Sequence, residues 1–314
     1  MKRAGSIASL FGPLITAIIF FGFSGCVNSP ENKSPLPGAM KINPAGYDLF
    51  APDRTIILPP VLLEVSGIVM LDTITVATIQ DENGVIFIFD LKKNSIEHYC
   101  SFHMDGDYED LTLANNMIYV LRSDGVLFQV ENYRRDGHSK RVISSGIPPA
   151  DYEGLCYDSI NNRLLILPKN MSGSSSEYNG RHPVFGFDLK NEVFYPNPII
   201  EFDLGVINKF AADSMDFSPA KEDSPGQPVD VGIKFRPSAM AINPTSGKIF
   251  VLSAAEHLMF IFDKNGNVEY IGRLDPEVFN APEGITFSDN GDLLISNEGK
   301  VSPPNILRFN YRLN

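Results

Sequence analysis

The chain has 314 residues, a formal net charge of −12 and no tryptophan. Because a protein with a sequence pI near 4.9 repels phosphate backbones, we expect no nucleic-acid partner. The length is sufficient for one large hydrophobic core.

The first 25 residues have the pattern of a signal peptide. Lys2 and Arg3 form a positive start, and the apolar stretch 10–23 is shorter than the ~20 residues that a membrane-spanning helix needs. Phe23-Ser24-Gly25-Cys26 then resembles the bacterial lipobox, which prefers Leu where Phe23 stands. We predict a lipoprotein signal peptide over 1–25 and a lipid on Cys26, with an ordinary secretory signal and a chance cysteine as the alternative.

A lipid on Cys26 makes membrane lipid a partner and places the protein in the bacterial cell envelope. Cleavage before Cys26 removes two positive charges and leaves a formal charge of −14. The residue after the cysteine is Val27, whereas an Asp at this position would oppose delivery to the outer membrane. The outer membrane is therefore favoured, and the sequence does not indicate whether the protein faces the periplasm or the cell surface. Residues 26–45, rich in Pro, Asn, Ser and Lys, predict a flexible tether, and 46–314 form a single domain.

A short motif recurs five times in that domain and opens an apolar strand each time. The intervals between its copies are 43, 44, 85 and 45 residues, and four-stranded propeller blades run ~40–45 residues. The copies are Ser66-Gly67-Ile68, Glu109-Asp110-Leu111, Glu153-Gly154-Leu155, Ser238-Ala239-Met240 and Glu283-Gly284-Ile285. Polar turns and further short strands follow each copy, so the period predicts an all-β propeller.

The third strand of each blade has the most regular pattern, an aromatic-apolar alternation that often ends in Asp. It is clearest at 85–90, 184–188 and 258–263. The last blade has no room for a fourth strand, and Arg54-Thr55-Ile56-Ile57-Leu58 can supply it and close the ring.

The 85-residue interval leaves the number of blades open. Residues 205–234 lack strand alternation and contain Ser-Pro, Pro-Gly and Gln-Pro breakers, so we predict an insertion and five blades, with six as the alternative. A second insertion is expected at 169–183. Because blade strands are antiparallel, both insertions fall on one face, and long loops gathered at one end of a scaffold are typical of a binding face.

The leading positions of the motif lie on the innermost strands, at the channel mouth of that same face. They are Ser66, Glu109, Glu153, Ser238 and Glu283. Three converging carboxylates raise each other's pKa values unless a cation compensates. A calcium-like ion on the three glutamates, a cationic ligand, or Arg122 and Lys169 at the ends of second strands are the candidates. The alternative is structural: each glutamate accepts hydrogen bonds from backbone amides of a neighbouring blade.

Motifs for other chemistry are absent from the sequence, which has no GxSxG, HExxH, P-loop or GxGxxG pattern outside the leader. His257 after Glu256 is a weak acid–base candidate. Cys100 and Cys156 lie in apolar strand patterns without a CxxC motif, and we predict that they are buried small hydrophobes.

The motif openings, with Asp107-Tyr108-Glu109, Asp151-Tyr152-Glu153 and Phe235 to Met240 followed by Asn243-Pro244, resemble the SdiA-regulated domain family of bacterial propellers. The resemblance covers about residue 50 to the C-terminus. It implies an envelope-associated propeller with calcium as a candidate ligand and no established reaction. Gluconolactonase-like propellers are less similar, since only Glu283, Asn297 and Glu298 approach their Glu-Asn-Asn-Asp metal set.

The sequence therefore predicts a monomeric binding or interaction module for an unknown protein or small molecule, without catalysis. A metal-dependent hydrolase of a lactone or ester, using the channel carboxylates, is the alternative function. A scaffold whose channel is filled by side chains is the third.

Overall fold

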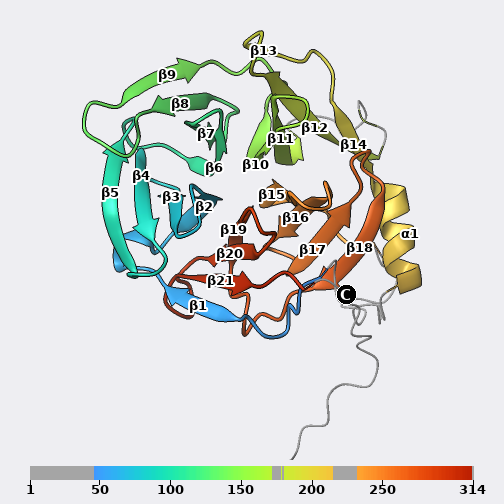
Figure 1. Ribbon diagram of the computed structural model, residues 1–314. Helices are drawn as coiled ribbons and strands as arrows, with labels where there is room; N and C mark the ends of the chain where they lie inside the picture. Colours follow the sequence, from blue (N-terminus) through green and yellow to red (C-terminus); the bar gives the residue numbers. More distant parts are fainter. Residues whose placement is uncertain (1–45, 172–177, 179, 215–231, 313–314) are drawn as a thin grey trace, which may run out of the picture. The chain divides into compact units, whose positions relative to one another are not determined.

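The computed structural model describes residues 46–171, 178, 180–214 and 232–312. The chain divides into the units Met1–Met40 and Lys41–Asn314, and every described residue belongs to the second. That unit is a ring of five antiparallel sheets, a five-bladed β-propeller (Figure 1). The prediction of five blades is confirmed, and six are excluded. The predicted signal peptide, Cys26 and the tether lie outside the described residues.

Each blade runs from its innermost strand outward. Blade 1 is β2 (Val65–Met70), β3 (Thr75–Gln80), β4 (Val85–Asp90) and β5 (Ser95–Ser101). Blade 2 is β6 (Tyr108–Ala114), β7 (Met117–Arg122), β8 (Leu127–Glu131) and β9 (Ser139–Ile143). Blade 3 is β10 (Ala150–Asp158), β11 (Arg163–Met171), β12 (Arg181–Asp188), β13 (Val193–Phe194) and β14 (Ile200–Asp203). Blade 4 is β15 (Ala239–Ile242), β16 (Ile249–Ser253), β17 (Leu258–Phe262) and β18 (Val268–Arg273). Blade 5 is β19 (Pro282–Phe287), β20 (Leu293–Asn297), β21 (Asn305–Phe309) and β1 (Arg54–Ile57).

The ring is closed by β1, as predicted. This N-terminal strand pairs antiparallel with β21, the last strand of the chain, in the register Arg54–Arg308 to Ile57–Asn305. A 3-10 turn, η1 (Pro60–Leu62), then leads into β2. Pairing the two ends of the propeller in one blade removes the open sheet edges that an unclosed ring would leave.

The Asp that ends several third strands forms a turn. Asp90 Oδ1 accepts hydrogen bonds from the backbone N–H groups of Lys92 and Lys93, both at 2.8 Å. Asp188 and Asp263 do the same for the residues that follow them. A side-chain carboxylate that caps its own turn starts the return to the fourth strand, which explains why the pattern repeats.

Blade 3 differs from the prediction at its outer edge. The fourth strand expected at 199–204 is present as β14, and a further short strand, β13, also pairs with β12. β11 and β12 also extend into 169–183, which was expected to be a loop. The start of the 205–234 insertion is a helix, α1 (Leu204–Ser214), which the sequence analysis missed. Ile207 and Ala211 are its buried residues, and they join the core between blades 3 and 4 because a spacing of four places both on one face.

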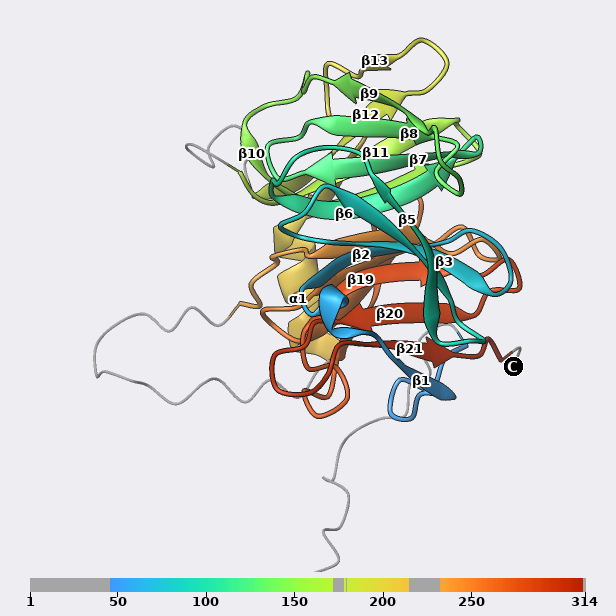
Figure 2. The same cartoon turned by 90° about the vertical axis from the view of Figure 1, so that its left-hand side faces the viewer.

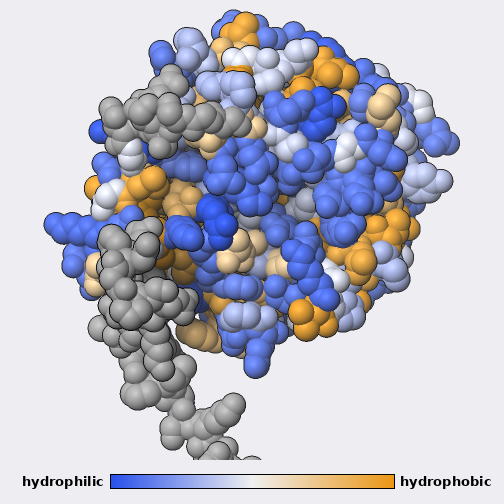
Figure 3. Space-filling view, turned by 180° about the vertical axis from the view of Figure 1, so that it is seen from behind, coloured by the Kyte–Doolittle hydropathy of each residue, from blue (hydrophilic) through white to orange (hydrophobic). Residues whose placement is uncertain are grey.

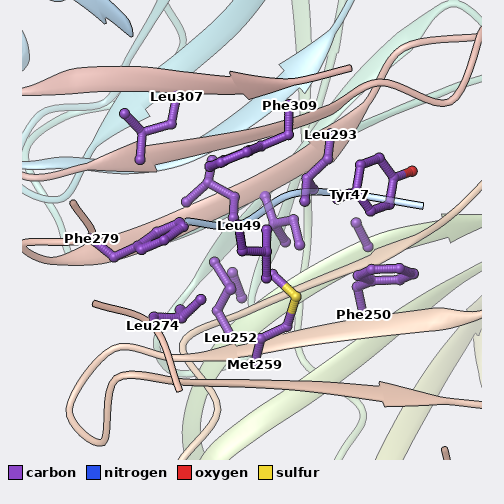
Figure 4. Packing of buried hydrophobic residues seen from close by; sticks show 14 of the residues in the cluster. Tyr47, Leu49, Phe250, Leu252, Met259, Leu274, Phe279, Leu293, Leu307 and Phe309 are labelled. Atoms are coloured by element: carbon purple, nitrogen blue, oxygen red, sulfur yellow. The ribbon is translucent and has the colours of Figure 1, made fainter. Parts of the chain in front are cut away.

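The N-terminal segment before β1 belongs to the core. Tyr47 and Leu49 pack among residues of blades 4 and 5, with Phe250 and Phe309 in the same cluster (Figure 4). The Tyr47 hydroxyl donates to Gly291 O at 2.5 Å and accepts from Asn243 Nδ2 at 2.7 Å. Tyr47 is fully buried, so this segment is a fixed part of the propeller.

Both ends of the described chain lie on one face of the ring, opposite the face that carries the second-to-third and fourth-to-first strand connections (Figure 2). Arg312 N donates to Gly46 O at 2.9 Å. Gly46 has a φ of +102°, and a Cβ there would meet the Tyr311 ring, so glycine is required at this entry point. Among the described residues, no helix is long and apolar enough to cross a membrane.

Candidate functional site

We call the face that carries the second-to-third and fourth-to-first strand connections the channel face (Figure 3). Its centre is covered by hydrophilic residues. The innermost strands β2, β6, β10, β15 and β19 begin here, and so do the five leading positions of the repeat. Blade topology therefore brings the predicted site residues to one end of the ring.

The two serines of the set are structural. Ser66 Oγ donates to Tyr108 O at 2.9 Å, and Ser238 Oγ donates to Pro282 O at 3.2 Å. Each serine thus joins the start of its own blade to the start of a neighbouring blade. Both residues are buried, and both hydroxyls are engaged in these inter-blade hydrogen bonds.

Glu109 stands at the start of β6 and is half-buried. Desolvation raises the pKa of this carboxyl well above its ordinary value, and the charges of Glu153 and Asp107 raise it further. A hydrogen bond with Asp107 favours the same protonated form. Glu109 is therefore a neutral acid at neutral pH, as expected for carboxylates that crowd one opening.

Glu153 has the compensating partner that the sequence analysis proposed. Lys169 Nζ lies 2.7 Å from Glu153 Oε1, at the end of β11. Burial still raises the pKa of Glu153, while the ammonium of Lys169 lowers it. The glutamate is 6% exposed, so this is a largely desolvated ion pair that would be costly to break from one side.

Glu283, at the start of β19, has no direct ion-pair partner among the described residues. Desolvation raises its pKa to about 8, with added repulsion from Glu298 and Glu153. Nearby, desolvation and the charge of Glu64 raise the pKa of Asp81 to about 6. The carboxyls of this face are thus held in a site that disfavours their charged forms.

Arg122 does not compensate these carboxylates. Its guanidinium forms a two-bond pair with Asp124, at 2.9 Å for both contacts, and lies over the Phe128 ring. Asp124 is two residues further along the same turn, so it is nearer to Arg122 in sequence than any glutamate of the channel mouth. Of the two cations that the sequence offered, Lys169 is the one paired with a glutamate of the channel mouth among the described residues.

A pocket of about 360 Å³ opens on the channel face over blades 3 to 5. Three predicted site residues line it: Lys169, Ser238 and Glu283. The rest of its lining is Arg236, Ala254, Ala255, His257, Asn280, Ala281 and Lys300. The pocket therefore contains three cationic side chains and one carboxyl that is mostly protonated at pH 7.

Each cation of the pocket has an acidic partner that does not itself line the pocket. Arg236 pairs with Glu256, Lys300 Nζ lies 2.6 Å from Glu298 Oε2, and Lys169 pairs with Glu153. These pairs fix the cations in place, yet an ammonium has three donors and a guanidinium has five. Donors remain to receive an anionic group.

His257 lines this pocket, but the acid–base pair predicted with Glu256 does not form. Glu256 is occupied by Arg236 and by the hydroxyl of Ser253. His257 Nδ1 lies 3.1 Å from Phe279 O, so this nitrogen carries the proton that it donates to the carbonyl. His257 also has a left-handed backbone, with a φ of +49° in the β16–β17 turn.

Asp110 is the functional position that the sequence analysis overlooked. Its carboxylate accepts hydrogen bonds from Leu111 N and Leu155 N, both at 2.8 Å, and so joins blade 2 to blade 3. This is the backbone role that was considered for the glutamates. The signal was present in the repeat, because Asp110 stands where Gly67, Gly154 and Gly284 stand in other copies.

A shared metal site on Glu109, Glu153 and Glu283 does not fit this arrangement. Within the part of the chain that the structure describes, no group of three or more His, Cys, Asp or Glu side chains is placed to hold a metal ion. Glu153 is held by an ammonium, and desolvation and the neighbouring carboxyls of Glu153 and Asp107 favour the uncharged form of Glu109. Calcium therefore stays a prediction, and we derive no metal-assisted step. Cys100 and Cys156 are buried and free, as predicted.

The opposite mouth of the ring has different chemistry. A pocket of about 310 Å³ lies there, lined by Met70, Leu71, Asp72, Thr73, Leu113, Ser288, Asp289, Asn290 and Arg308. Its Asp72 pairs with Arg134, and its Arg308 pairs with Asp292. None of the predicted site residues lines it, so the channel face remains the candidate site.

No family model matches the chain, and no curated protein sequence matches it. Solved structures, in contrast, are similar to it. Glutaminyl cyclase of Myxococcus xanthus is similar with a TM-score of 0.56 and 12% identity, over 84% of this chain and 97% of that one. Virginiamycin B lyase from Staphylococcus aureus has a TM-score of 0.41 and 12% identity, over 78% and 67%. At such identity the likeness shows the fold alone: this chain is a β-propeller protein.

Proposed function

We propose that this protein is a lipid-anchored binding module of the bacterial cell envelope that takes a small anion-bearing ligand into the pocket of the channel face. One observation carries the proposal: Lys169, Arg236 and Lys300 line a single pocket together with Glu283, whose raised pKa leaves it mostly uncharged. Each of these cations also has an acidic partner, so the lining offers fixed, charged hydrogen-bond donors rather than a large net charge. Carboxylates and phosphates are the groups that fixed ammonium and guanidinium donors bind best.

The proposed anchor is compatible with an open pocket. The chain enters the propeller at Gly46, beside Arg312, on the face opposite the pocket. A lipid on Cys26, followed by a tether over 26–45, would hold the protein by that opposite face. The pocket face would then carry no attachment point, and the module would act as a monomer. We also propose membership of the SdiA-regulated group of propellers, on the motifs at 107–109 and 151–153.

Binding of two simple anions tests this function. The full chain with Cys26→Ser, which removes the acylation site, is heated with succinate or inorganic phosphate, and with the neutral diamide of succinate as control. Arg236→Gln removes a pocket cation. Arg181→Gln is the matched control, since Arg181 pairs with Glu201 and is 54% exposed outside this pocket.

We expect one of the two anions to raise the melting temperature of the parent chain and of the Arg181 variant. The Arg236 variant should lose the shift, and the diamide should give none. Absence of any shift with either anion at millimolar concentration, or an equal shift in both arginine variants, contradicts the proposal.

A further inference from the structure

The cations and carboxyl groups of the channel face are unevenly distributed between its two halves, although each cation of the pocket has an acidic partner. The three pocket cations come from the end of β11, the segment before β15 and the β20–β21 connection, over blades 3 to 5. Carboxyl groups dominate the mouth over blades 1 to 3: Glu64, Asp81, Asp107, Glu109, Asp151 and Glu153. A ligand in the pocket therefore lies beside a region that attracts positive charge.

One ion pair joins the two halves. Lys169 lines the pocket, and its ammonium lies 2.7 Å from Glu153 Oε1. Glu153 in turn interacts with Glu109 and Asp107. An anionic group held by Lys169 is thus one side chain away from the acidic cluster, a separation that a small molecule can span.

The acidic half has one direct cationic partner within the described residues. Lys169 is the single cation that forms a direct ion pair with Asp107, Glu109, Asp151 or Glu153 within the described residues. The same residues offer no group of three acidic or His side chains arranged around a metal. An ammonium group, with three donors and one charge, fits this cluster.

From these observations we infer that the ligand is a zwitterion of the amino-acid type: its anionic group lies between Lys169, Arg236 and Lys300, and its ammonium group lies at Glu109 and Glu153. This inference rests on the proposed function, because it specifies the ligand of the same pocket. The ammonium would lower the pKa of Glu109, which then loses its proton to the solvent, since a nearby positive charge favours the carboxylate. Amine binding therefore releases a proton, and anion binding alone does not.

Glutamate and glutarate form a matched pair of probes, because they differ by the α-amino group. Their affinities for the full chain with Cys26→Ser are measured by calorimetry at pH 7, in two buffers of different ionisation enthalpy. We expect glutamate to bind at least tenfold more tightly than glutarate and to release a proton. This comparison needs no variant of the site.

Variants then locate the two charges. Glu109→Gln should lower the glutamate affinity to that of glutarate and abolish proton release, while Asp105→Asn, an exposed acid of the preceding loop, should change neither. Arg236→Gln should weaken both ligands. Equal affinities of glutamate and glutarate in the parent chain overturn the zwitterion and leave the anion site standing. Failure of both ligands overturns both proposals, and so does tight binding of butylamine that Arg236→Gln leaves unchanged.

Discussion

Replacing Glu283 by glutamine removes a carboxyl that the fold keeps protonated. Burial raises the pKa of Glu283 to about 8 in the folded protein. In the unfolded chain a glutamate titrates near ~4.3. Between these values the folded state binds one proton more than the unfolded state at this position. The free energy of unfolding therefore falls as the pH rises through this window.

The size of the effect follows from linkage. One full proton of difference gives a slope of about 1.4 kcal/mol per pH unit. Glu109, whose pKa is also raised, contributes a slope of the same sign. We expect the stability of the parent chain to fall between pH 5.5 and pH 7.5. Glu283→Gln should make that fall shallower by up to about 1.4 kcal/mol per pH unit.

Urea unfolding followed by far-ultraviolet circular dichroism measures this slope, since the chain has no tryptophan to report it by fluorescence. At pH 5.5 the variant and the parent should be close in stability, because both carry a neutral side chain at this site. Glu277→Gln is the control for net charge, since Glu277 is exposed in the loop before β19. Parallel pH profiles of the parent and Glu283→Gln would refute the burial argument.

Three further changes test the scaffold. Tyr47→Phe should lower the free energy of unfolding by about 1–3 kcal/mol, because Gly291 O and Asn243 Nδ2 would lose their hydrogen bonds to the buried hydroxyl. An unchanged free energy of unfolding would show that the segment before β1 does not contribute to the core in this way. Gly284→Ala should destabilise by about 1–3 kcal/mol, since its Cβ would overlap the hydroxyl of Ser296. Gly205→Ala in α1 serves as the comparison and should be neutral or stabilising by the same melting assay. Burial raises the pKa of Cys100 to about 11, so a maleimide should label this thiol only in urea; labelling of the native protein would contradict its burial.

The blades could be predicted because their information is local and repeated. Each motif copy is followed by strands with period-two apolar alternation, and the same turn chemistry recurs at Asp90, Asp188 and Asp263. The closing strand was predictable for a topological reason, since the last blade had three strands and the ring needed a fourth. Helix α1 was missed because its two buried residues, Ile207 and Ala211, form a very short apolar pattern beside proline-rich sequence.

The sequence predicted where the site lies more reliably than it predicted which side chains contact one another there. Repeat register alone put Glu109, Glu153 and Glu283 at one end of the ring. It did not show that Arg122 would turn to Asp124, or that Arg236 and Lys300 would join Lys169 around one pocket. These cations lie in connections outside the repeat, where the period carries no information.

The sequence by itself determined the propeller architecture, the closing strand and the face on which the acidic positions gather, because strand alternation and repeat period are properties of the chain, whereas the structure decided between five and six blades. Only the tertiary structure decided the charge states of those positions. The raised pKa values of Glu109 and Glu283 arise from desolvation and from charges on neighbouring blades. Glu153, which lies 44 positions from Glu109 and 130 from Glu283, contributes to both, and its distance from each exists only once the ring has closed.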